Sequence, residues 1–176
     1  MDLEMTGLDP ETDAIIEMAT VITDCQLEII AKGPELIIHQ PPERFQQMDD
    51  WNREHHKKSG LWDKVIASQV TQGDAERETM NFISIHVDPK VSPLCGNSVY
   101  QDRRFLTKYM PRLESYLHYR LIDVSTIKEL GQRWYGEQAK FPKALGAHRA
   151  MEDILESIAE LKNYRERLFV KTLAEK

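Results

Sequence analysis

The sequence is poor in cysteine and has no long apolar run. Its two cysteines, Cys25 and Cys95, form no Cys-x-x-Cys pair. Isolated cysteines without a secretory segment indicate free thiols in a reducing compartment rather than a disulfide framework. No apolar run approaches the roughly 18 residues that a membrane-spanning helix needs. No signal or transit peptide is visible at the start. We therefore expect a cytoplasmic protein, or a mitochondrial one if the native gene encodes a presequence before Met1.

Basic residues are also fewer than acidic ones. The chain has 23 lysines and arginines against 29 aspartates and glutamates, a net charge of −6. This balance argues against a broad basic surface that holds long nucleic acid through counterion release. A nucleic-acid substrate should therefore be short, or be held chiefly through metal. The 176 residues, 41% hydrophobic and 30% charged, are typical of one globular domain spanning 1–176.

The most informative stretch is the N-terminal DLEMTGLD. Asp2 and Glu4 lie two residues apart in an apolar run that Thr6-Gly7 ends, which is typical of the end of a strand. Side chains two residues apart leave a strand on the same face, about 7 Å from each other. If that face is buried, the two carboxylates need a cation between them, and Mg²⁺ or Mn²⁺ suits such oxygen ligands. The alternative is an exposed edge strand with solvated acids.

The order of the expected elements predicts an α/β fold. Runs rich in Ile, Val and Thr at 14–23 and 27–39 predict an antiparallel meander with the opening strand. Gly33-Pro34 predicts a bulge or an edge position in the third strand. Ser125 is the expected N-cap of a helix. We expect helices at 43–48, 49–58, 61–66, 75–87, 102–110, from 111, at 126–134 and at 147–169, a loop at 136–146, and buried strands at 91–95 and 120–124. This order favours a mixed sheet, three antiparallel strands plus parallel crossovers, flanked by helices.

Two further carboxylates and a histidine are candidates to join the first pair. Asp102 starts a helix soon after a strand, where ligands collect in such sheets, although a first-turn acid can also simply interact with the helix dipole. Asp153 lies at the border of the buried face of the last helix, and Glu152 projects away from it. His148 can reach the same cleft from the loop entering that helix; the alternative is an ordinary surface or capping histidine. Such a set fits phosphodiester hydrolysis by two divalent ions about 4 Å apart, with a base taking the proton of water.

Three motifs carry a resemblance to a known family. Asp2-x-Glu4-x-Thr6-Gly7, Asn97-Ser98-x-x-Gln101-Asp102 and His148-x-x-x-x-Asp153 resemble the motifs of the DEDDh 3′-to-5′ exonucleases, which have a ribonuclease H-like fold. The strings at 2–9, 48–52, 96–98, 102–111 and 118–130 resemble the members that degrade very short RNAs. The likeness runs from residue 2 to about 169. It implies a metal-dependent exoribonuclease that hydrolyses dinucleotides and very short oligoribonucleotides to 5′ mononucleotides with two Mg²⁺ or Mn²⁺ ions.

The resemblance also implies a role for each matching residue. The metal ligands would be Asp2, Glu4, Asp102 and Asp153, and the general base would be His148. The base-packing residues would be Leu8 and Trp51, and the 5′ phosphate would be enclosed by Ser98 and His56 together with Tyr119 and Arg120 of the partner subunit. An arginine fork suits a terminal phosphate. Because part of this enclosure comes from the neighbouring chain, the resemblance implies a homodimer. Without the resemblance, Leu8 and Trp51 could equally be ordinary core, and Tyr119-Arg120 the start of a structural strand.

The chain departs from the family pattern at two places, and the first of them matters. Members have several apolar residues before the first aspartate, whereas only Met1 precedes Asp2 here, so fewer ladder bonds hold Asp2. The usual Asp-Asp pair of the last motif is Glu152-Asp153, which leaves the ligand position intact. Two other functions stay open: a DEDDh exonuclease acting on longer DNA or RNA, and a non-catalytic nucleic-acid-binding module. Rates on two-mers and ten-mers separate the first from a short-RNA enzyme, and binding with Mn²⁺ but without hydrolysis identifies the second.

Overall fold

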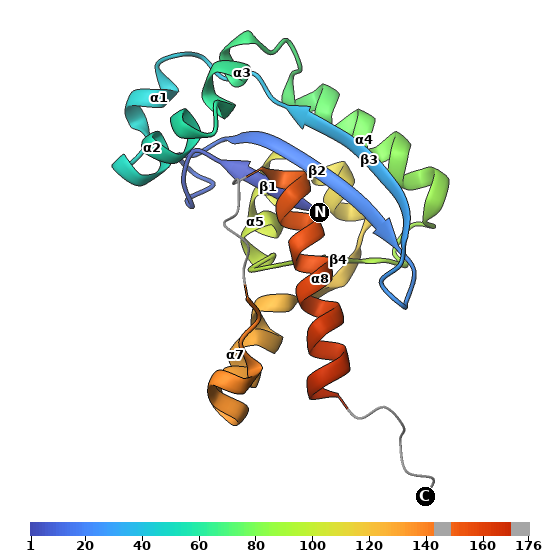
Figure 1. Cartoon of the computed structure of the whole chain (residues 1–176). Coiled ribbons are helices and arrows are strands. Elements are labelled where there is room, and N and C mark those ends of the chain that lie inside the picture. The colour runs from blue at the N-terminus through green and yellow to red at the C-terminus, as the bar shows by residue number, and fades with distance from the viewer. Residues whose placement is uncertain (143–148, 170–176) are drawn as a thin grey trace, which may run out of the picture.

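A computed structural model describes residues 1–142 and 149–169 and contains a three-stranded antiparallel sheet (Figure 1). Its strands are β1 (Asp2–Met5), β2 (Ile15–Thr23) and β3 (Ile29–Ile37), in the order β1-β2-β3. β-branched residues dominate β2, which suits a strand covered on both faces. The antiparallel meander predicted from the sequence is confirmed.

The strand β3 lies at the edge of this sheet. It forms its ladder with β2, and the register shifts between Ala19 and Val21, opposite Gly33-Pro34. A Cβ atom added at Gly33 would lie 2.6 Å from the ring of Phe82, so helix α4 (Gln72–His86) packs closely on the strand there. The predicted bulge is confirmed, and it places proline where no ladder donor is needed.

Two further strands pair in parallel. β4 (Pro93–Gly96) and β5 (His118–Asp123) form a two-stranded sheet of their own in the described part of the chain. The sequence predicted that all five strands form one mixed sheet, whereas in the described residues they form two separate sheets. The amino group of Met1 donates to the carbonyl of Cys95 at 3.2 Å, which brings β1 to the side of β4. The two strands nevertheless belong to different sheets in the described residues.

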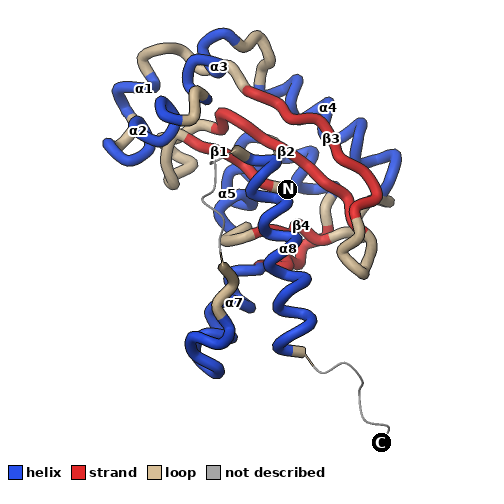
Figure 2. Tube along the Cα trace, viewed as in Figure 1, coloured by secondary structure: helices blue, strands red, loops and turns tan. Residues whose placement is uncertain are grey.

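Helices cover both faces of the three-stranded sheet (Figure 2). Met18 packs in the cluster that contains Ile83 of α4 and Phe105, whereas the next residue, Ala19, packs against Ile154. Neighbouring residues of a strand point to opposite faces, so the last helix covers the face opposite α4. The helices other than α4 are α1 (Arg44–Gln47), α2 (Asp50–Lys58), α3 (Leu61–Ala67), α5 (Tyr100–Tyr109), α6 (Pro111–Tyr116), α7 (Val124–Tyr135) and α8 (Ala150–Leu168), with a short 3₁₀ helix at Gly136–Ala139.

The start of α7 differs from the prediction. Asp123, not Ser125, is the N-cap, and its carboxylate accepts the backbone N–H of Ser125 at 2.9 Å. The Ser125 hydroxyl instead donates to Oδ1 of Asn97 at 2.9 Å, so a tertiary contact outcompetes the local cap. The predicted start of the last helix at 147 lies outside the described residues.

The described residues also bear on the two absences noted in the sequence. Cys25 is an exposed free thiol and Cys95 a half-buried one. Across 1–142 and 149–169, no helix combines the length and the apolar character that crossing a membrane requires.

Candidate active site

The strand β1 and the helix α8 bring three carboxylates together. Asp2 and Glu4 flank Leu3, which is buried in the core, so both acids leave β1 on the opposite face, toward α8. Asp153 lies in the first turn of α8. Carboxylate oxygens of Asp2, Glu4 and Asp153 all lie within 4.8 Å of one another. Three hard oxygen donors at this spacing fit a divalent cation such as Mg²⁺ or Mn²⁺.

Asp102 lies beside this acidic cluster and is hydrogen-bonded to β1, the strand that contains Asp2 and Glu4. Its side chain comes from the first turn of α5, is 5% exposed, and accepts the backbone N–H of Leu3 at 2.9 Å. Burial, the largest cause, raises the pKa of Asp102 to about 7. Its negative charge in turn raises the pKa of Asp2, so the two groups interact electrostatically. The structure therefore groups three of the four predicted ligands. The fourth, Asp102, is hydrogen-bonded to the backbone N–H of Leu3, the residue between Asp2 and Glu4.

Burial and like charge disfavour ionisation within the cluster. Burial is the largest cause that raises the pKa of Asp2, followed by the charges of Asp102, Glu4 and Asp153. The pKa of Glu4 rises from its ordinary 4.5 to about 8, again chiefly by burial and then by the charges of Asp153 and Glu17. A bound divalent cation would remove most of this repulsion. The electrostatics thus fit a metal site.

A buried ion pair supports the cluster from the next strand. Glu17 lies directly opposite Glu4 in the ladder and is 1% exposed. Arg149, the residue before α8, donates to the Glu17 carboxylate through Nη2 at 2.6 Å and Nε at 2.9 Å, and the N–H of Ala150 donates at 3.2 Å. The pair neutralises a buried acid and fixes the chain one residue after His148. Sequence reasoning missed this pair, although a lone acid in an apolar strand signals a buried partner.

The predicted base-contacting residues are exposed. Leu8 is 62% exposed and Trp51 is 57% exposed, so the alternative that they are ordinary core residues is wrong. The Trp51 ring stacks on His55 with a centroid distance of 3.8 Å. His56 in the same helix is 2% exposed, and its Nε2 lies 2.9 Å from the carbonyl oxygen of Met5. Helix α2 is therefore attached to the end of β1, and Trp51, five residues before His56, lies on the exposed surface of this helix.

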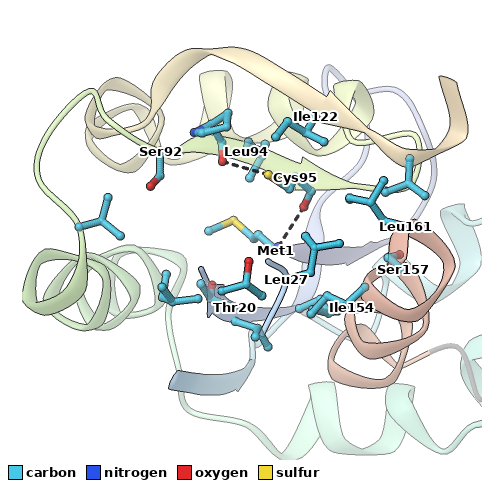
Figure 3. A pocket seen from close by; sticks show the side chains of 18 of the residues that line it. Met1, Thr20, Leu27, Ser92, Leu94, Cys95, Ile122, Ile154, Ser157 and Leu161 are labelled. Atoms are coloured by element: carbon cyan, nitrogen blue, oxygen red, sulfur yellow. Dashed lines mark hydrogen bonds between the residues drawn. The ribbon is translucent and has the colours of Figure 1, made fainter. Parts of the chain in front are cut away.

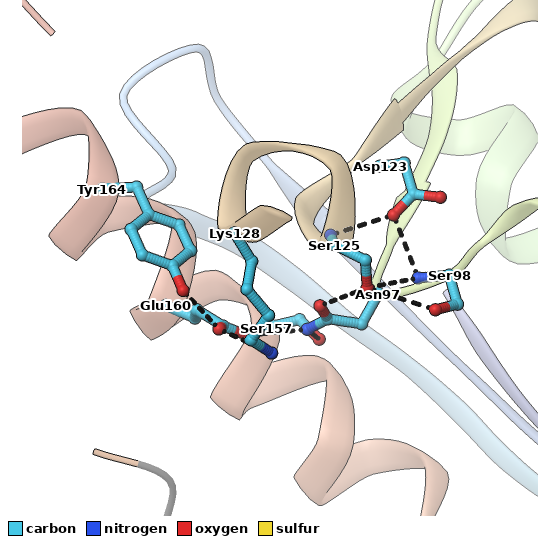
Figure 4. Close-up of polar contacts among 8 residues, drawn as sticks. All are labelled: Asn97, Ser98, Asp123, Ser125, Lys128, Ser157, Glu160 and Tyr164. Carbon is cyan, nitrogen blue, oxygen red and sulfur yellow. Dashed lines mark hydrogen bonds and ion pairs between the residues drawn. The ribbon is translucent and has the colours of Figure 1, made fainter. Parts of the chain in front are cut away.

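The predicted phosphate-contacting residues lie on and beside the second sheet. Ser98 follows β4 with φ of 49°, and its N–H donates to Asp123 Oδ1 and Ser125 Oγ, each at 3.0 Å (Figure 4). On β5, Tyr119 is 71% exposed, and the Arg120 guanidinium lies 5.1 Å from the centre of its ring. The predicted base, His148, lies outside the described residues.

A buried polar network joins the end of β4 to α7 and α8 (Figure 4). Glu160 is fully buried and is contacted by Lys128 at 3.0 Å, by the Tyr164 hydroxyl at 2.8 Å and by the Asn97 amide at 3.0 Å. The Asn97 amide also donates to the Ser157 hydroxyl at 2.9 Å. These contacts fix the residue before Ser98. Sequence reasoning missed Glu160, whose spacing of three from Ser157 places it on the same helical face.

Comparison with known proteins identifies the family. The Exonuclease family profile, RNase_T, matches residues 1–161. A protein named oligoribonuclease from Shewanella amazonensis is 57% identical over 169 residues, which are 96% of this chain and 93% of the relative. The chain belongs to the oligoribonuclease family. A human relative named "Oligoribonuclease, mitochondrial" is 54% identical over 177 residues, covering 100% of this chain and 75% of the relative. The resemblance drawn from the three sequence motifs is confirmed, and membership makes this chain a hydrolytic exonuclease.

A solved structure supports the fold. An exonuclease I from Methylocaldum szegediense superposes with a TM-score of 0.65 over 95% of this chain and 40% of that chain, at 17% identity. This likeness concerns the fold alone. Together with the family membership, it establishes the predicted ribonuclease H-like fold for this oligoribonuclease family member.

Without metal, the stability of the chain is expected to fall as pH rises. A carboxyl group whose pKa is raised on folding stabilises the fold while protonated, and this contribution is lost between its unfolded and its folded pKa. For Glu4 that window runs from 4.5 to about 8. Each pKa unit corresponds to about 1.4 kcal/mol, or roughly 3–5 °C in Tm for a chain of this size. In EDTA we expect Tm to drop by at least about 5 °C from pH 5.5 to 8.5.

Metal should reverse this loss. We expect Mn²⁺ to raise Tm at pH 8.5 and to do little at pH 5.5, because protons and metal compete for the same oxygens. Glu4→Gln should flatten the pH dependence, because the substituted side chain cannot ionise. A Tm in EDTA that does not change with pH, together with no effect of Mn²⁺ at pH 8.5, would contradict the metal site.

Proposed function

We propose that this chain is a metal-dependent 3′-to-5′ exoribonuclease that hydrolyses dinucleotides and very short oligoribonucleotides to 5′ mononucleotides. The observation that carries the proposal is the convergence of the Asp2, Glu4 and Asp153 carboxylates within 4.8 Å. Relatives named oligoribonucleases support the substrate class.

The acidic residues would hold two divalent ions. Asp2, Glu4 and Asp153 would be ligands, and Asp102, whose charge already acts on Asp2, would complete the set. Bound ions of this kind activate a water molecule and neutralise charge on the phosphodiester oxygens. Asp102 has a second role, since its bond to the N–H of Leu3 keeps β1 in place.

His148 would take the proton of the attacking water. Consecutive Cα atoms lie about 3.8 Å apart, so His148 is tethered one residue from Arg149. The hydrogen bonds from Arg149 to Glu17 fix the position of Arg149 beside Glu4. The ion pair would therefore position the base without touching the substrate.

The remaining residues would define a short substrate. Leu8 and Trp51, which are both exposed, would pack on the bases, and stacking contributes about 1–3 kcal/mol per base. Ser98 and His56 would line the end that receives the 5′ phosphate, closed by Tyr119 and Arg120 of the partner subunit. The exposure of both Tyr119 and Arg120 on β5 supports a contact with a second copy, so we propose a homodimer.

The proposal is tested by the dependence of rate on substrate length. With Mn²⁺, a 5′-phosphorylated two-mer of RNA should be cleaved at least about tenfold faster than a ten-mer, because a charge-assisted phosphate contact contributes about 1.5–3 kcal/mol. EDTA should stop both reactions. Arg120→Ala should remove most of the preference for the two-mer, whereas Arg112→Ala, at another exposed arginine, should not. Equal rates on both lengths would instead favour a general DEDDh exonuclease, and saturable binding without product would favour a non-catalytic module.

A further inference from the structure

Glu160 is a buried carboxylate that the proposed reaction does not use. It lies about two turns after Asp153 on α8, roughly 10 Å along the helix axis, which is too far for the two to share a metal ion. Lys128 lies 3.0 Å from Oε1 of Glu160, and the Tyr164 hydroxyl donates to the same oxygen at 2.8 Å. Apolar side chains of similar volume often stabilise a core as well as a buried ion pair does. The pair is therefore a candidate for specifying the geometry of its neighbours.

The ionised Glu160 determines which way round the Asn97 amide lies (Figure 4). Burial raises the pKa of Glu160, but the hydrogen bonds that it accepts outweigh burial and hold this pKa below its ordinary 4.5. An ionised carboxylate only accepts hydrogen bonds, so the Asn97 group that lies 3.0 Å from Oε2 is the NH₂. This NH₂ also donates to the Ser157 hydroxyl at 2.9 Å. Oδ1 of Asn97 therefore faces α7, where it accepts the Ser125 hydroxyl at 2.9 Å.

Apolar surroundings on the side of α8 strengthen this orientation. Ser157 borders a cavity whose lining from α8 also includes Ile154, Ile158 and Leu161 (Figure 3). Hydrogen bonds are stronger in an apolar surrounding than in water, and a buried polar group left without its partner is costly. A reversed Asn97 would place its oxygen against the carboxylate of Glu160.

The orientation of Asn97 also determines the direction of the hydrogen bond between Ser125 and Ser98. The Ser125 hydroxyl has a single hydrogen, which it donates to Asn97. It can therefore only accept at its other two contacts, from the N–H of Ser98 at 3.0 Å and from the Ser98 hydroxyl at 3.1 Å. All hydrogen bonds along this route thus point from Ser98 toward Glu160.

Ser98 has a backbone conformation that needs such support. Its φ of 49° is in the left-handed region, which is uncommon for residues other than glycine. Such a conformation persists where the surrounding contacts hold it, and it is enriched at ligand sites. The N–H of Ser98 donates to Asp123 Oδ1 and Ser125 Oγ, each at 3.0 Å, while the residue itself is exposed. An exposed hydroxyl on a backbone that buried polar groups hold fits a ligand contact.

We propose that Glu160, acting through Asn97 and Ser125, is a positioning residue for the 5′-phosphate end of the substrate site. The inference rests on the proposed function, in which Ser98 contacts the 5′ phosphate. Glu160 does not touch the substrate. It holds Ser98 in place, and on binding the Ser98 hydroxyl exchanges Ser125 for a phosphate oxygen as its acceptor. A donor that is already in position needs no ordering when the anion arrives, so losing Glu160 should weaken binding of the phosphate.

The test measures KM and kcat with Mn²⁺ on a dinucleotide that carries a 5′ phosphate and on the same dinucleotide with a 5′ hydroxyl. The variant combines Glu160→Met, Lys128→Met and Tyr164→Phe, which replaces the ion pair and its donor by apolar side chains and leaves no charge unpaired. Its KM for the phosphorylated dinucleotide should rise at least about fivefold, because a charge-assisted hydrogen bond is misplaced. Its KM for the 5′-hydroxyl dinucleotide, and kcat on both, should stay within about twofold of the parent.

Tyr164→Phe alone is the matched control. It removes a hydrogen bond to Oε1 of Glu160 but leaves the contact of Asn97 with Oε2. It should lower Tm, because a buried hydrogen bond is lost, and should keep the parent KM for both dinucleotides. The triple variant should show the reverse, a Tm close to that of the parent and a lost preference for the phosphate. These opposite patterns separate positioning from stability.

Asn97→Ala interrupts the same route while keeping the ion pair, and it decides the question if the triple variant does not fold. It should also raise KM for the phosphorylated dinucleotide alone, and adding it to the triple variant should change little more. Equal losses on both dinucleotides, or a parent-like preference in these variants, would overturn the inference and leave the proposed function intact. A parent chain without any preference for the 5′ phosphate would instead contradict the proposed function, and the inference with it.

Discussion

Asp153→Asn should reduce hydrolysis of a 5′-phosphorylated dinucleotide by at least about 10³-fold while leaving the chain folded. A metal ion contributes several kcal/mol to stabilising the transition state, and each 1.36 kcal/mol corresponds to about tenfold in rate. Asp153 is one of three carboxylates whose oxygens lie within 4.8 Å of one another, so replacing it removes charge and a ligand atom at once. The rate with saturating Mn²⁺ is the measurement.

The same variant should be more stable than the parent chain when metal is absent. The charge of Asp153 is the largest contribution after burial to the raised pKa of Glu4, and it also raises the pKa of Asp2. Removing it lowers the cost of ionising the others, so Tm in EDTA at pH 8.5 should rise. At that pH the variant should also lose most of the stabilisation by Mn²⁺. Opposite changes in activity and stability distinguish a ligand from a residue that merely supports the fold.

Glu152→Gln is the matched control. Glu152 is the adjacent residue of α8, carries the same charge and is exposed. It should keep the parent rate and the parent response to Mn²⁺. If Asp153→Asn retains full activity on the dinucleotide, or if Glu152→Gln loses as much, the acidic cluster is not the catalytic centre.

The parts of the site that follow from local periodicity were predictable from the sequence. Asp2 and Glu4 share a face because side chains of a strand alternate, and Asp153 lies at the border of the buried stripe because a helix turns 100° per residue. The meander and the bulge at Gly33-Pro34 also follow from local composition. Each of these inferences needs only neighbours within a few residues.

The parts that depend on distant residues were not predictable in this way. The bond from Asp102 to the N–H of Leu3 joins residues 99 positions apart, and the pair of Glu17 and Arg149 joins residues 132 apart. The Ser125 cap was wrong because Asn97, 28 residues earlier, competes for its hydroxyl. The family resemblance supplied the fold and the substrate that we propose, but it could not indicate the buried partners that hold the proposed ligands in place.

His148→Ala should lower the turnover number by about 10²–10⁴-fold, the usual contribution of a positioned general base. Replacing a general base should leave metal binding intact, whereas replacing a metal ligand should not. In EDTA and in Mn²⁺, the Tm of His148→Ala should match the parent at both pH 5.5 and pH 8.5, because the carboxylates of Asp2, Glu4 and Asp153 are unchanged. Asp153→Asn, by contrast, should alter both Tm values at pH 8.5.

His39→Ala is the control for this substitution, since His39 is an exposed histidine whose backbone N–H bonds to Val70. It should keep the parent rate. Full activity of His148→Ala would remove the base from the mechanism, whereas loss of the Mn²⁺ effect on Tm would reassign His148 as a metal ligand.

Arg149, the residue that follows His148 in the sequence, is anchored to Glu17 beside Glu4. Arg149→Ala should therefore lower the turnover number in the same direction as His148→Ala, and combining the two should cost less than the product of the single losses.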